Sequence, residues 1–481
     1  MENLSVISRN PSVIYIGAEN IDEDRIDGEF YNYKYLENEI KLKKSGIKIK
    51  VLNDVIERMN SPIGWQGIPS SSYLPHGLGV PLIRVQNVSD LILDEESLIG
   101  VEESIYDEQP AIQAQPNDII ITRVGTIGRV CRIPEKINRI AMGQNLTRIK
   151  LNETLVESGF MLAYMSSKFC QIQMERYAYG GVQASLTNKN IKQLLVPIPS
   201  PEIQKYIGDK VRKAEELREE AKRLKKDAEE IFYEAIEIDK LNSKLIKVTK
   251  FSWIKENQIE DRLDLKYNSP SIITIYEHFR KYKCSLLKDE FKTISGYAFS
   301  SGDFDDMDGE KVIKIGDISD FTIDTTSLTR VKIGTKVKER IREFSCNIQD
   351  LVYAMTGATI GKVAMYIDNE TVYINQRVAC IKPKRNNIPT GYLLLYLNSD
   401  IGKEISYSLS TGVAQPNIAL EELNNIVIPQ LANNIMDKIH HNVLNSLIKH
   451  KESKQLIQEA KQDVEDLIEG NFDMSKVKAN S

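Results

Sequence analysis

Residues 118–130 read DIIITRVGTIGRV, and residues 350–363 read DLVYAMTGATIGKV. Each segment begins with an aspartate, continues in a short β-rich run and ends in a glycine-containing turn that closes with Thr-Ile-Gly and a basic residue. A β-rich run followed by such a turn is typical of a strand and a tight reversal of the chain. The sequence therefore predicts the same local structure at two distant places.

Further matched segments follow one another in the same order in both halves of the chain. They are RIDGEFYN (25–32) with RLDLKYNS (262–269), IRVQNVSD (83–90) with IKIGDISD (313–320), GQNLTRIKL (143–151) with INQRVACIKP (374–383), GFMLAYMSSKF (159–169) with GYLLLYLNSDI (391–401), and GGVQASLTNKNIKQLLVPIP (180–199) with TGVAQPNIALEELNNIVIPQ (411–430). Three pairs keep one offset of 232 residues, as from Gln144 to Gln376. This period is far longer than that of a solenoid repeat. The chain therefore contains a duplicated domain.

Each half has the same predicted order of elements, which gives a mixed α/β (α+β) fold with two tandem domains. Strands come first, a short helix follows near 159–176 or 391–406, and a strand with a proline precedes a long helix. The predicted segments are an N-terminal extension (1–20), a first domain (21–200), a central helix (201–240), a linker (241–255), a second domain (256–430), a C-terminal helix (431–470) and a tail (471–481).

The two long helices carry a narrow apolar stripe. Such a stripe, with apolar residues alternately four and three apart, predicts a coiled-coil seam. The seam residues are Ile203, Ile207, Val211, Leu217, Leu224, Ala228, Ile435, Ile439, Val443, Leu456 and Ala460. A helix of roughly 55 Å with such a stripe needs a partner. We expect the two helices to pair as an antiparallel coiled coil about a pseudo-two-fold axis.

Composition restricts the class of protein. The net charge of −5 argues mildly against nucleic-acid binding, although the local field matters more than the total. The five cysteines are scattered without CxxC spacing, which predicts neither a disulfide framework nor a zinc site. The N-terminus lacks the features of a signal peptide, and no apolar run approaches the ~20 residues of a membrane span. We expect a cytoplasmic protein.

Catalytic motifs are missing from the sequence. TGATIGKV (356–363) has GxxxGK rather than GxxxxGK, and Val363 replaces the Ser or Thr of a phosphate-binding loop. No GxGxxG opens a βαβ unit, and no HExxH occurs. The adjacent His440 and His441 would point in different directions on a helix, so metal binding there is not expected. We expect a chain without catalytic residues, metal or cofactor of its own.

Polar and basic side chains recur at equivalent places in both halves. Such side chains contact phosphates and base edges in protein–DNA complexes. The candidate DNA-binding residues are Arg84, Gln86, Arg123, Thr126, Arg129, Gln144, Asn145, Arg148, Gln183, Ser185, Lys314, Thr356, Thr359, Lys362, Gln376, Arg377, Gln415 and Asn417. Alternatively, the shared Thr-Ile-Gly and the two glutamines fix a turn and a buried hydrogen bond. Identical residues cannot explain the reading of two different sequences, so base-reading residues should lie where the halves differ, at positions such as 60–80, 100–116 and 296–310.

With these features together, the chain resembles the specificity (S) subunit of type I restriction-modification systems. The resemblance rests on TRVGTIGRV and MTGATIGKV, GQN and NQR, GVQAS and GVAQPN, and the strand and long helix that end each half. It implies two target-recognition domains that each read one half of a bipartite DNA site, and helices that set the spacer. It also implies two methyltransferase (M) subunits that bring S-adenosylmethionine, and possible restriction (R) subunits that use ATP and magnesium.

Two other classes of function are compatible with parts of the sequence. A coiled-coil scaffold or adaptor without a DNA role would suit the acidic composition, whereas divergence of two copies around a common frame favours recognition of two half-sites. A stand-alone nuclease or methyltransferase would have to act without partners. Within the favoured class, the host could also be a type II enzyme or another phage-defence methyltransferase.

Overall fold

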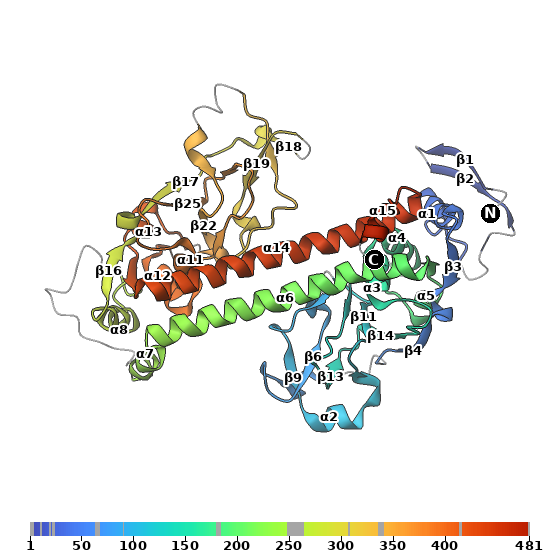
Figure 1. The fold of residues 1–481 in the computed structure, drawn as a ribbon, viewed down its shortest axis with the longest axis horizontal. Helices are drawn as coiled ribbons and strands as arrows, with labels where there is room; N and C mark the ends of the chain where they lie inside the picture. The colour runs from blue at the N-terminus through green and yellow to red at the C-terminus, as the bar shows by residue number, and fades with distance from the viewer. Residues whose placement is uncertain are drawn as a thin grey trace. The chain divides into compact units, whose positions relative to one another are not determined.

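The fold comes from a computed structural model, which describes residues 4–9, 12–18, 21, 25–62, 68–89, 91–178, 184–247, 264–305, 308–334, 341–412 and 416–479. The chain forms two compact units (Figure 1). Unit 1 contains Met1–Leu217 and Glu452–Ser481, and unit 2 contains Arg218–Lys451. Both boundaries fall inside the long helices α6 (Pro201–Ala235) and α14 (Asn433–Glu469), so each unit includes part of both helices.

Unit 1 combines short strands with helices. Its strands are β1 (Leu4–Arg9), β2 (Ser12–Ile16), β3 (Lys48–Val51), β4 (Ile56–Asn60), β5 (Tyr73–Leu74), β6 (Val80–Ile83), β7 (Val88–Ser89), β8 (Ile92–Leu93), β9 (Ile99–Val101), β10 (Gln113–Ala114), β11 (Ile119–Thr122), β12 (Val130–Arg132), β13 (Ile140–Met142), β14 (Leu146–Leu151) and β15 (Leu195–Ile198). Its shorter helices are α1 (Tyr33–Lys44), α2 (Glu103–Glu108), α3 (Ser158–Ser166), α4 (Lys168–Tyr177), α5 (Asn188–Lys192) and α15 (Ser475–Ala479).

Unit 2 repeats this composition. Its strands are β16 (Lys283–Leu286), β17 (Phe291–Ser295), β18 (Phe304–Asp305), β19 (Glu310–Ile313), β20 (Arg330–Val331), β21 (Ser345–Cys346), β22 (Leu351–Ala354), β23 (Val363–Met365), β24 (Val372–Ile374), β25 (Val378–Pro383) and β26 (Val427–Gln430). Its shorter helices are α7 (Ile238–Leu245), α8 (Pro270–Phe279), α9 (Leu287–Glu290), α11 (Thr390–Asn398), α12 (Asp400–Leu409) and α13 (Leu420–Asn424).

The sheets confirm the predicted duplication strand by strand. The four-stranded sheet β12-β11-β14-β4 of unit 1 corresponds to β23-β22-β25-β17 of unit 2. The five-stranded sheet β10-β13-β6-β9-β5 corresponds to β21-β24-β19-β20-β18, and the pair β15-β3 corresponds to β26-β16. The proline-containing strands β15 and β26 each have one partner, where a missing N–H does not break a ladder.

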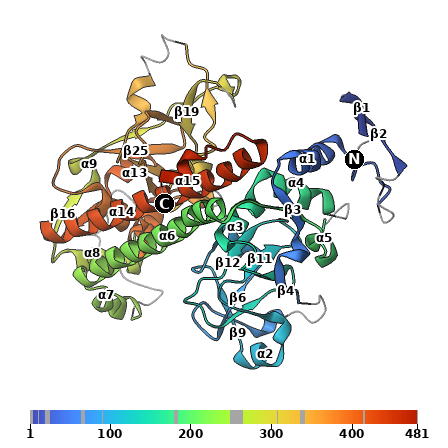
Figure 2. The same cartoon turned by 45° about the vertical axis from the view of Figure 1, so that its right-hand side comes forward.

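The central strand of the four-stranded sheet, β11 in unit 1 and β22 in unit 2, is buried on both faces. In unit 1, Ile119 and Ile121 face a core with α3 and α4, whereas Ile120 between them faces a core with the five-stranded sheet (Figure 2). Alternate residues of a strand point to opposite faces, so a sheet covered on both faces requires a continuous apolar run. This explains why DIIIT and DLVYA read as unbroken β-rich segments.

Two expected helices differ in detail from the sequence prediction. The single helix expected near 159–176 is two helices, because Ser167 between α3 and α4 is extended with ψ of 157°. Ser399 separates α11 from α12 in the same way, and its hydroxyl accepts a hydrogen bond from the Gly402 N–H. The prediction of one helix in each half was therefore wrong, because an extended serine at this point ends the first helix and precedes the second.

The ends of the long helices also differ from the prediction. Helix α6 ends at Ala235 rather than near residue 240, and Glu237 then adopts a left-handed conformation with φ of 51° before α7 begins. The expected linker 241–255 therefore begins inside a helix, and its remainder from residue 248 lies outside the described residues. Helix α14 begins at Asn433, close to the expected start.

Within each unit, the two long helices run in opposite directions. In unit 1, the Lys210 ammonium lies 2.6 Å from the Asp463 carboxylate, and the Ser453 hydroxyl donates a 2.7 Å hydrogen bond to the Ala214 carbonyl. In unit 2, the Ser446 hydroxyl donates a 2.7 Å hydrogen bond to the Ala221 carbonyl. Each serine is 232 residues from the alanine of the other unit's bond, so the duplication extends to these buried contacts.

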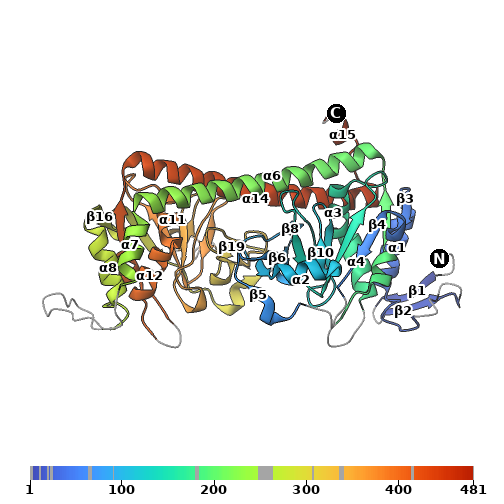
Figure 3. The same cartoon turned by 90° about the horizontal axis from the view of Figure 1, so that it is seen from below.

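The predicted seam residues occupy the cores that the helices share with the domains. Most of them are buried, namely Ile203, Ile207, Val211, Leu217, Ala228, Ile439, Val443 and Ala460. Leu224 and Ile435 are half-buried. Leu456 lies at the edge of the core of unit 1, and the adjacent Ile457 occupies its interior. Figure 3 shows α3 beside α6 in unit 1, and the seam residues of α6 in this unit pack in the same core as α3.

Candidate nucleic-acid interface

Three loops of unit 1 that carry the repeated motifs meet at one end of the four-stranded sheet. The Arg123 N–H donates a 2.9 Å hydrogen bond to the Asn145 carbonyl, which joins the turn after β11 to the loop before β14. The Leu186 N–H donates to the Arg123 carbonyl at 3.0 Å, which adds the third loop. The Gly143 N–H donates to the Ile83 carbonyl at 2.8 Å and brings Arg84 to the same place.

Unit 2 joins its loops through the equivalent backbone atoms. The Met355 N–H donates to the Arg377 carbonyl at 3.1 Å, and the Ile418 N–H donates to the Met355 carbonyl at 3.0 Å. The Asn375 N–H donates to the Ile313 carbonyl at 3.0 Å. We call these two sets of joined loops the loop clusters of units 1 and 2. The motifs that the sequence analysis singled out are thus brought together in space by one repeated backbone frame.

The shared glycines have a structural role in this frame. Gly128 and Gly361 of the two Thr-Ile-Gly turns have φ of 81° and 84°, a region that side chains other than glycine rarely adopt. The sequence left open that the two shared glutamines form buried hydrogen bonds. The side chains of Gln144 and Gln376 are instead exposed. The alternative of a buried glutamine hydrogen bond is therefore wrong, and both amides are open to a ligand.

The predicted contact residues have different degrees of exposure. Exposed side chains are those of Gln86, Thr126, Arg129, Gln144, Gln376, Arg377 and Asn417. Half-buried side chains are those of Arg84, Asn145, Arg123, Ser185, Lys314, Thr356, Thr359 and Lys362. Gln183 and Gln415 lie outside the described residues. The exposed and half-buried residues give each loop cluster a polar surface with several cationic side chains. Arg148 belongs to neither group.

Arg123 is a side chain that distinguishes the two loop clusters. Its Nη2 donates a 2.9 Å hydrogen bond to the Gln144 carbonyl, its Nε is buried without a partner, and burial lowers the pKa of its guanidinium. Met355, an apolar core residue, takes the equivalent position in unit 2. The guanidinium of Arg123, held in place by this hydrogen bond, has the planar donor geometry that pairs with guanine or phosphate. The thioether of Met355 has no such donors.

Arg148 lies away from the loop clusters and is 4% exposed. Its Nη1 lies 3.7 Å from the Asp118 carboxylate and also donates to the Gln113 carbonyl. The carboxylate in turn accepts a 3.0 Å hydrogen bond from the Gln115 N–H. Arg148 is therefore held inside unit 1 by an ion pair, in contrast to the exposed position expected of a base-contacting residue.

An aromatic group next to the loop cluster of unit 2 was not identified individually from the sequence. Tyr297, Phe299, Phe304 and Phe344 pack in successive edge-on or tilted contacts with ring centroids 5.1–6.2 Å apart. The Lys314 ammonium lies 4.0 Å from the centroid of the Phe304 ring. Three of these rings fall in the segment 296–310, which the sequence marked as divergent. Their spacing follows no period, so only the fold could show that they meet.

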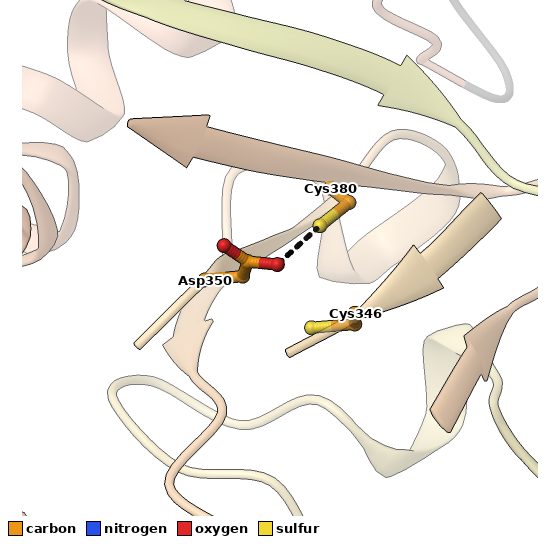
Figure 4. Close-up of side chains that lie close together, drawn as sticks. All are labelled: Cys346, Asp350 and Cys380. Carbon is orange, nitrogen blue, oxygen red and sulfur yellow. Dashed lines mark hydrogen bonds between the residues drawn. The ribbon is translucent and has the colours of Figure 1, made fainter. Parts of the chain in front are cut away.

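Cys346, Asp350 and Cys380 form a buried cluster in unit 2, with ligand atoms within 4.8 Å of one another (Figure 4). The Cys380 thiol donates a 3.8 Å hydrogen bond to the Asp350 carboxylate, and the Lys382 ammonium lies 3.6 Å from the same oxygen. Burial raises the pKa of the Cys346 thiol well above its usual value. A metal ion requires thiolates, whereas burial favours the neutral thiol, so these cysteines are better suited to hydrogen bonding than to metal binding.

Comparisons with known proteins agree with the duplicated architecture. The family described as "Type I restriction modification DNA specificity domain" matches residues 68–230 and 280–462, one region in each half. The chain belongs to this family. None of the helices in the described parts of the chain combines the length and apolar character needed to cross a bilayer.

Individual relatives match shorter stretches. The specificity subunit of the type I restriction enzyme EcoBI of Escherichia coli is 30% identical over 139 residues, which cover 29% of this chain and 28% of that protein. A putative type I specificity subunit, MjaX, of Methanocaldococcus jannaschii is 27% identical over 164 residues, which cover 34% and 36%. The chain thus spans about a third of the length of these relatives. The crystal structure of a type I S subunit from M. genitalium matches with 14% identity, 89% and 97% coverage and a TM-score of 0.45.

Proposed function

We propose that this chain is the non-catalytic DNA-specificity subunit of a restriction-modification complex, in which each domain reads one half of a bipartite site. The observation that carries the proposal is the repeated loop cluster, which keeps its backbone hydrogen bonds and changes its side chains. Arg123 in one cluster and Met355 in the other occupy the same place in the frame. A constant frame with different side chains is what the recognition of two different sequences by one fold requires.

The long helices are proposed to form an antiparallel coiled coil that fixes the spacing of the two half-sites. Support comes from the opposite helix directions within each unit and from the duplicated serine–carbonyl bonds. Equivalent major-groove faces recur about every 34 Å along B-DNA, so the length of a rigid connector sets the allowed spacer. The helices are also the proposed docking surface for two M subunits.

Catalysis in this proposal belongs to the partner subunits. The M subunits would bring S-adenosylmethionine, and R subunits, if the system has them, would bring ATP and magnesium. The chain itself would supply the choice of DNA sequence through side chains that contact phosphates and base edges.

Methylome sequencing of cells that express this chain with its neighbouring methyltransferase tests the proposal, with cells lacking the chain as the control. The expected result is a methylated motif of two short blocks separated by a fixed gap, which disappears without the chain. Unchanged methylation without the chain would contradict the proposal and favour the scaffold alternative. A bipartite motif in a host without R subunits would place the chain in a type II or other phage-defence system.

A change of helix length tests whether the long helices set the spacing of the two half-sites. Deletion of seven residues from α6 together with the seven facing residues of α14 keeps the apolar stripe in register. The expected result is methylation of the same two blocks with a different gap. Methylation at the original gap would contradict the role of the helices in setting the spacer.

A further inference from the structure

A small surface cavity lies on the four-stranded sheet of unit 1. Its volume is about 240 Å³ with the open mouth included, and it is lined by Arg58, Gln115, Asp118, Arg148 and Lys150. Sites for organic ligands usually have mostly apolar walls. The side chains around this cavity are all polar or charged, so it fits a small ion better than an organic ligand.

A buried guanidinium lies beneath the cavity. Arg148 is 4% exposed, and its Nε is buried without a hydrogen-bond partner. Its Nη1 is occupied by the Gln113 carbonyl and by the Asp118 carboxylate. Because this Nε is enclosed by the protein, Arg148 adds positive charge beneath the cavity rather than a direct contact with a ligand.

The cavity has more positive than negative charge. Arg58 and Lys150 come from neighbouring strands at paired positions, and both side chains are exposed. Lys150 lies 3.8 Å from Glu57 in an exposed and therefore weak ion pair, and among the described residues no carboxylate forms an ion pair with Arg58. Three cations thus surround Asp118, whose charge is already shared with Arg148 and the Gln115 N–H.

Unit 2 lacks this arrangement at the equivalent position. Cys380 replaces Arg148, and its thiol donates to Asp350, the equivalent of Asp118. Lys382 and Lys292 remain as the paired equivalents of Lys150 and Arg58. The buried guanidinium is therefore specific to unit 1, while the two outer cations occur in both units.

We propose that the cavity of unit 1 binds one phosphate group, held by Arg58 and Lys150 at the mouth, with the positive charge of the buried Arg148 beneath it. The phosphate belongs to the DNA backbone or is free in solution. The assignment of the phosphate to the DNA backbone rests on the proposed function. Arg148 and the loop cluster of unit 1 lie on one strand roughly 10–15 Å apart, which is well within one ~34 Å turn of a duplex.

The Arg58→Gln and Lys150→Gln variants test the cavity, because both side chains are exposed and the buried Asp118–Arg148 pair stays intact. The matched control is Lys292→Gln, the equivalent of Arg58 in unit 2. DNA binding by the complex of the full chain with its methyltransferase is measured against salt concentration. Inorganic phosphate binding to the full chain is followed by ³¹P NMR titration.

A backbone phosphate predicts that each cavity variant loses about one unit from the slope of log K against log salt, since each contact contributes about 0.9. The preferred bases should stay the same, the control should keep its slope, and inorganic phosphate should not bind in the millimolar range. A free phosphate predicts saturable binding of inorganic phosphate that weakens at least about fivefold in both cavity variants, with unchanged DNA slopes.

The proposal is overturned if neither slope nor phosphate binding changes, or if Lys292→Gln produces the same change as Arg58→Gln. The proposed function can fail separately from the cavity. A complex that binds no bipartite site while the chain still binds inorganic phosphate through Arg58 and Lys150 would contradict the function and support the cavity.

Discussion

Units 1 and 2 share one backbone frame but stabilise it with different chemistry. Asp118 and Asp350 each accept a hydrogen bond from the backbone three residues earlier, yet one faces a buried arginine and the other a cysteine thiol and a lysine. The first helix after β14 begins with Glu157 accepting two N–H bonds, and its counterpart begins with the Gly391 N–H donating to His440. The comparison teaches that a duplicated fold retains the need for a partner at each buried polar group, while the identity of the partner can change.

The largest expected contrast concerns the buried carboxylates. Asp118→Ala leaves the Arg148 guanidinium buried without a counter-ion, which should cost about 3–5 kcal/mol of unfolding free energy. Asp350→Ala leaves a neutral thiol and the partly exposed Lys382, which should cost about 1–3 kcal/mol. Urea denaturation of the full chain, followed by circular dichroism, measures both. Equal losses would show that water reaches the Arg148 guanidinium in the Asp118→Ala variant, so that it is less buried than the structure indicates.

The next contrast lies in the loop clusters. Arg123→Ala should relax the choice of base at one position of one half-site by about 1–3 kcal/mol, or roughly 5–150-fold, since a pinned guanidinium supplies two donors. Met355→Leu, which preserves volume at the equivalent position, should leave both half-sites unchanged. Methylation of a library of degenerate sites measures the two effects. A uniform loss of methylation at all sites would instead assign Arg123 a role in the fold or in phosphate contact.

The Thr-Ile-Gly turns should respond unequally to alanine. Gly128 and Gly361 share a positive φ, so either substitution should cost about 1 kcal/mol from backbone strain. A methyl group at Gly128 would also lie 2.9 Å from the Gln171 Oε1 and 3.0 Å from the Met174 Sδ, whereas at Gly361 the nearest atom is at 3.6 Å. Gly128→Ala should therefore be the more destabilising by up to about 1 kcal/mol in denaturant melts. Equal losses in the two variants would mean that Gln171 and Met174 move aside at no cost.

The smallest expected effect is a pH dependence confined to unit 2. Burial, with a smaller contribution from His441, lowers the pKa of His440, whose Nδ1 accepts the Gly391 N–H at 3.0 Å. As the pH falls, His440 therefore takes up a proton in the unfolded chain before it does so in the folded chain. The contact should stabilise the fold above about pH 6.5, and this stabilisation should be lost as the pH falls through the lower pKa of the folded state. Unit 1 has Gly208 at the equivalent position and lacks this titration.

His440→Gln tests this dependence, with the exposed neighbour His441→Gln as its control. The denaturation midpoint of the full chain is measured at pH 7.5 and pH 5.5. We expect a smaller difference between the two pH values for His440→Gln than for the control. An identical difference in the two variants would show that the acid sensitivity arises elsewhere.

Sequence reasoning succeeded where local pattern and duplication sufficed. Two copies of one motif order predicted two domains of the same topology, and the matched strand orders confirm this. It failed where a single residue interrupts a pattern, as at Ser167 and Ser399, which divide one expected helix into two. Whether an extended serine caps a new helix depends on packing on either side, which the helical pattern alone does not contain.

The sequence by itself determined the duplication, the β-rich runs of a sheet buried on both faces and the apolar stripes of the long helices, because these depend on periodicity along the chain. The tertiary structure decided which loops meet, that Gln144 and Gln376 are exposed, and that Arg148 is buried beside Asp118. The physical reason is that exposure and ion pairing depend on residues distant in sequence, such as Asp118 and Arg148, which become neighbours only when strands pair.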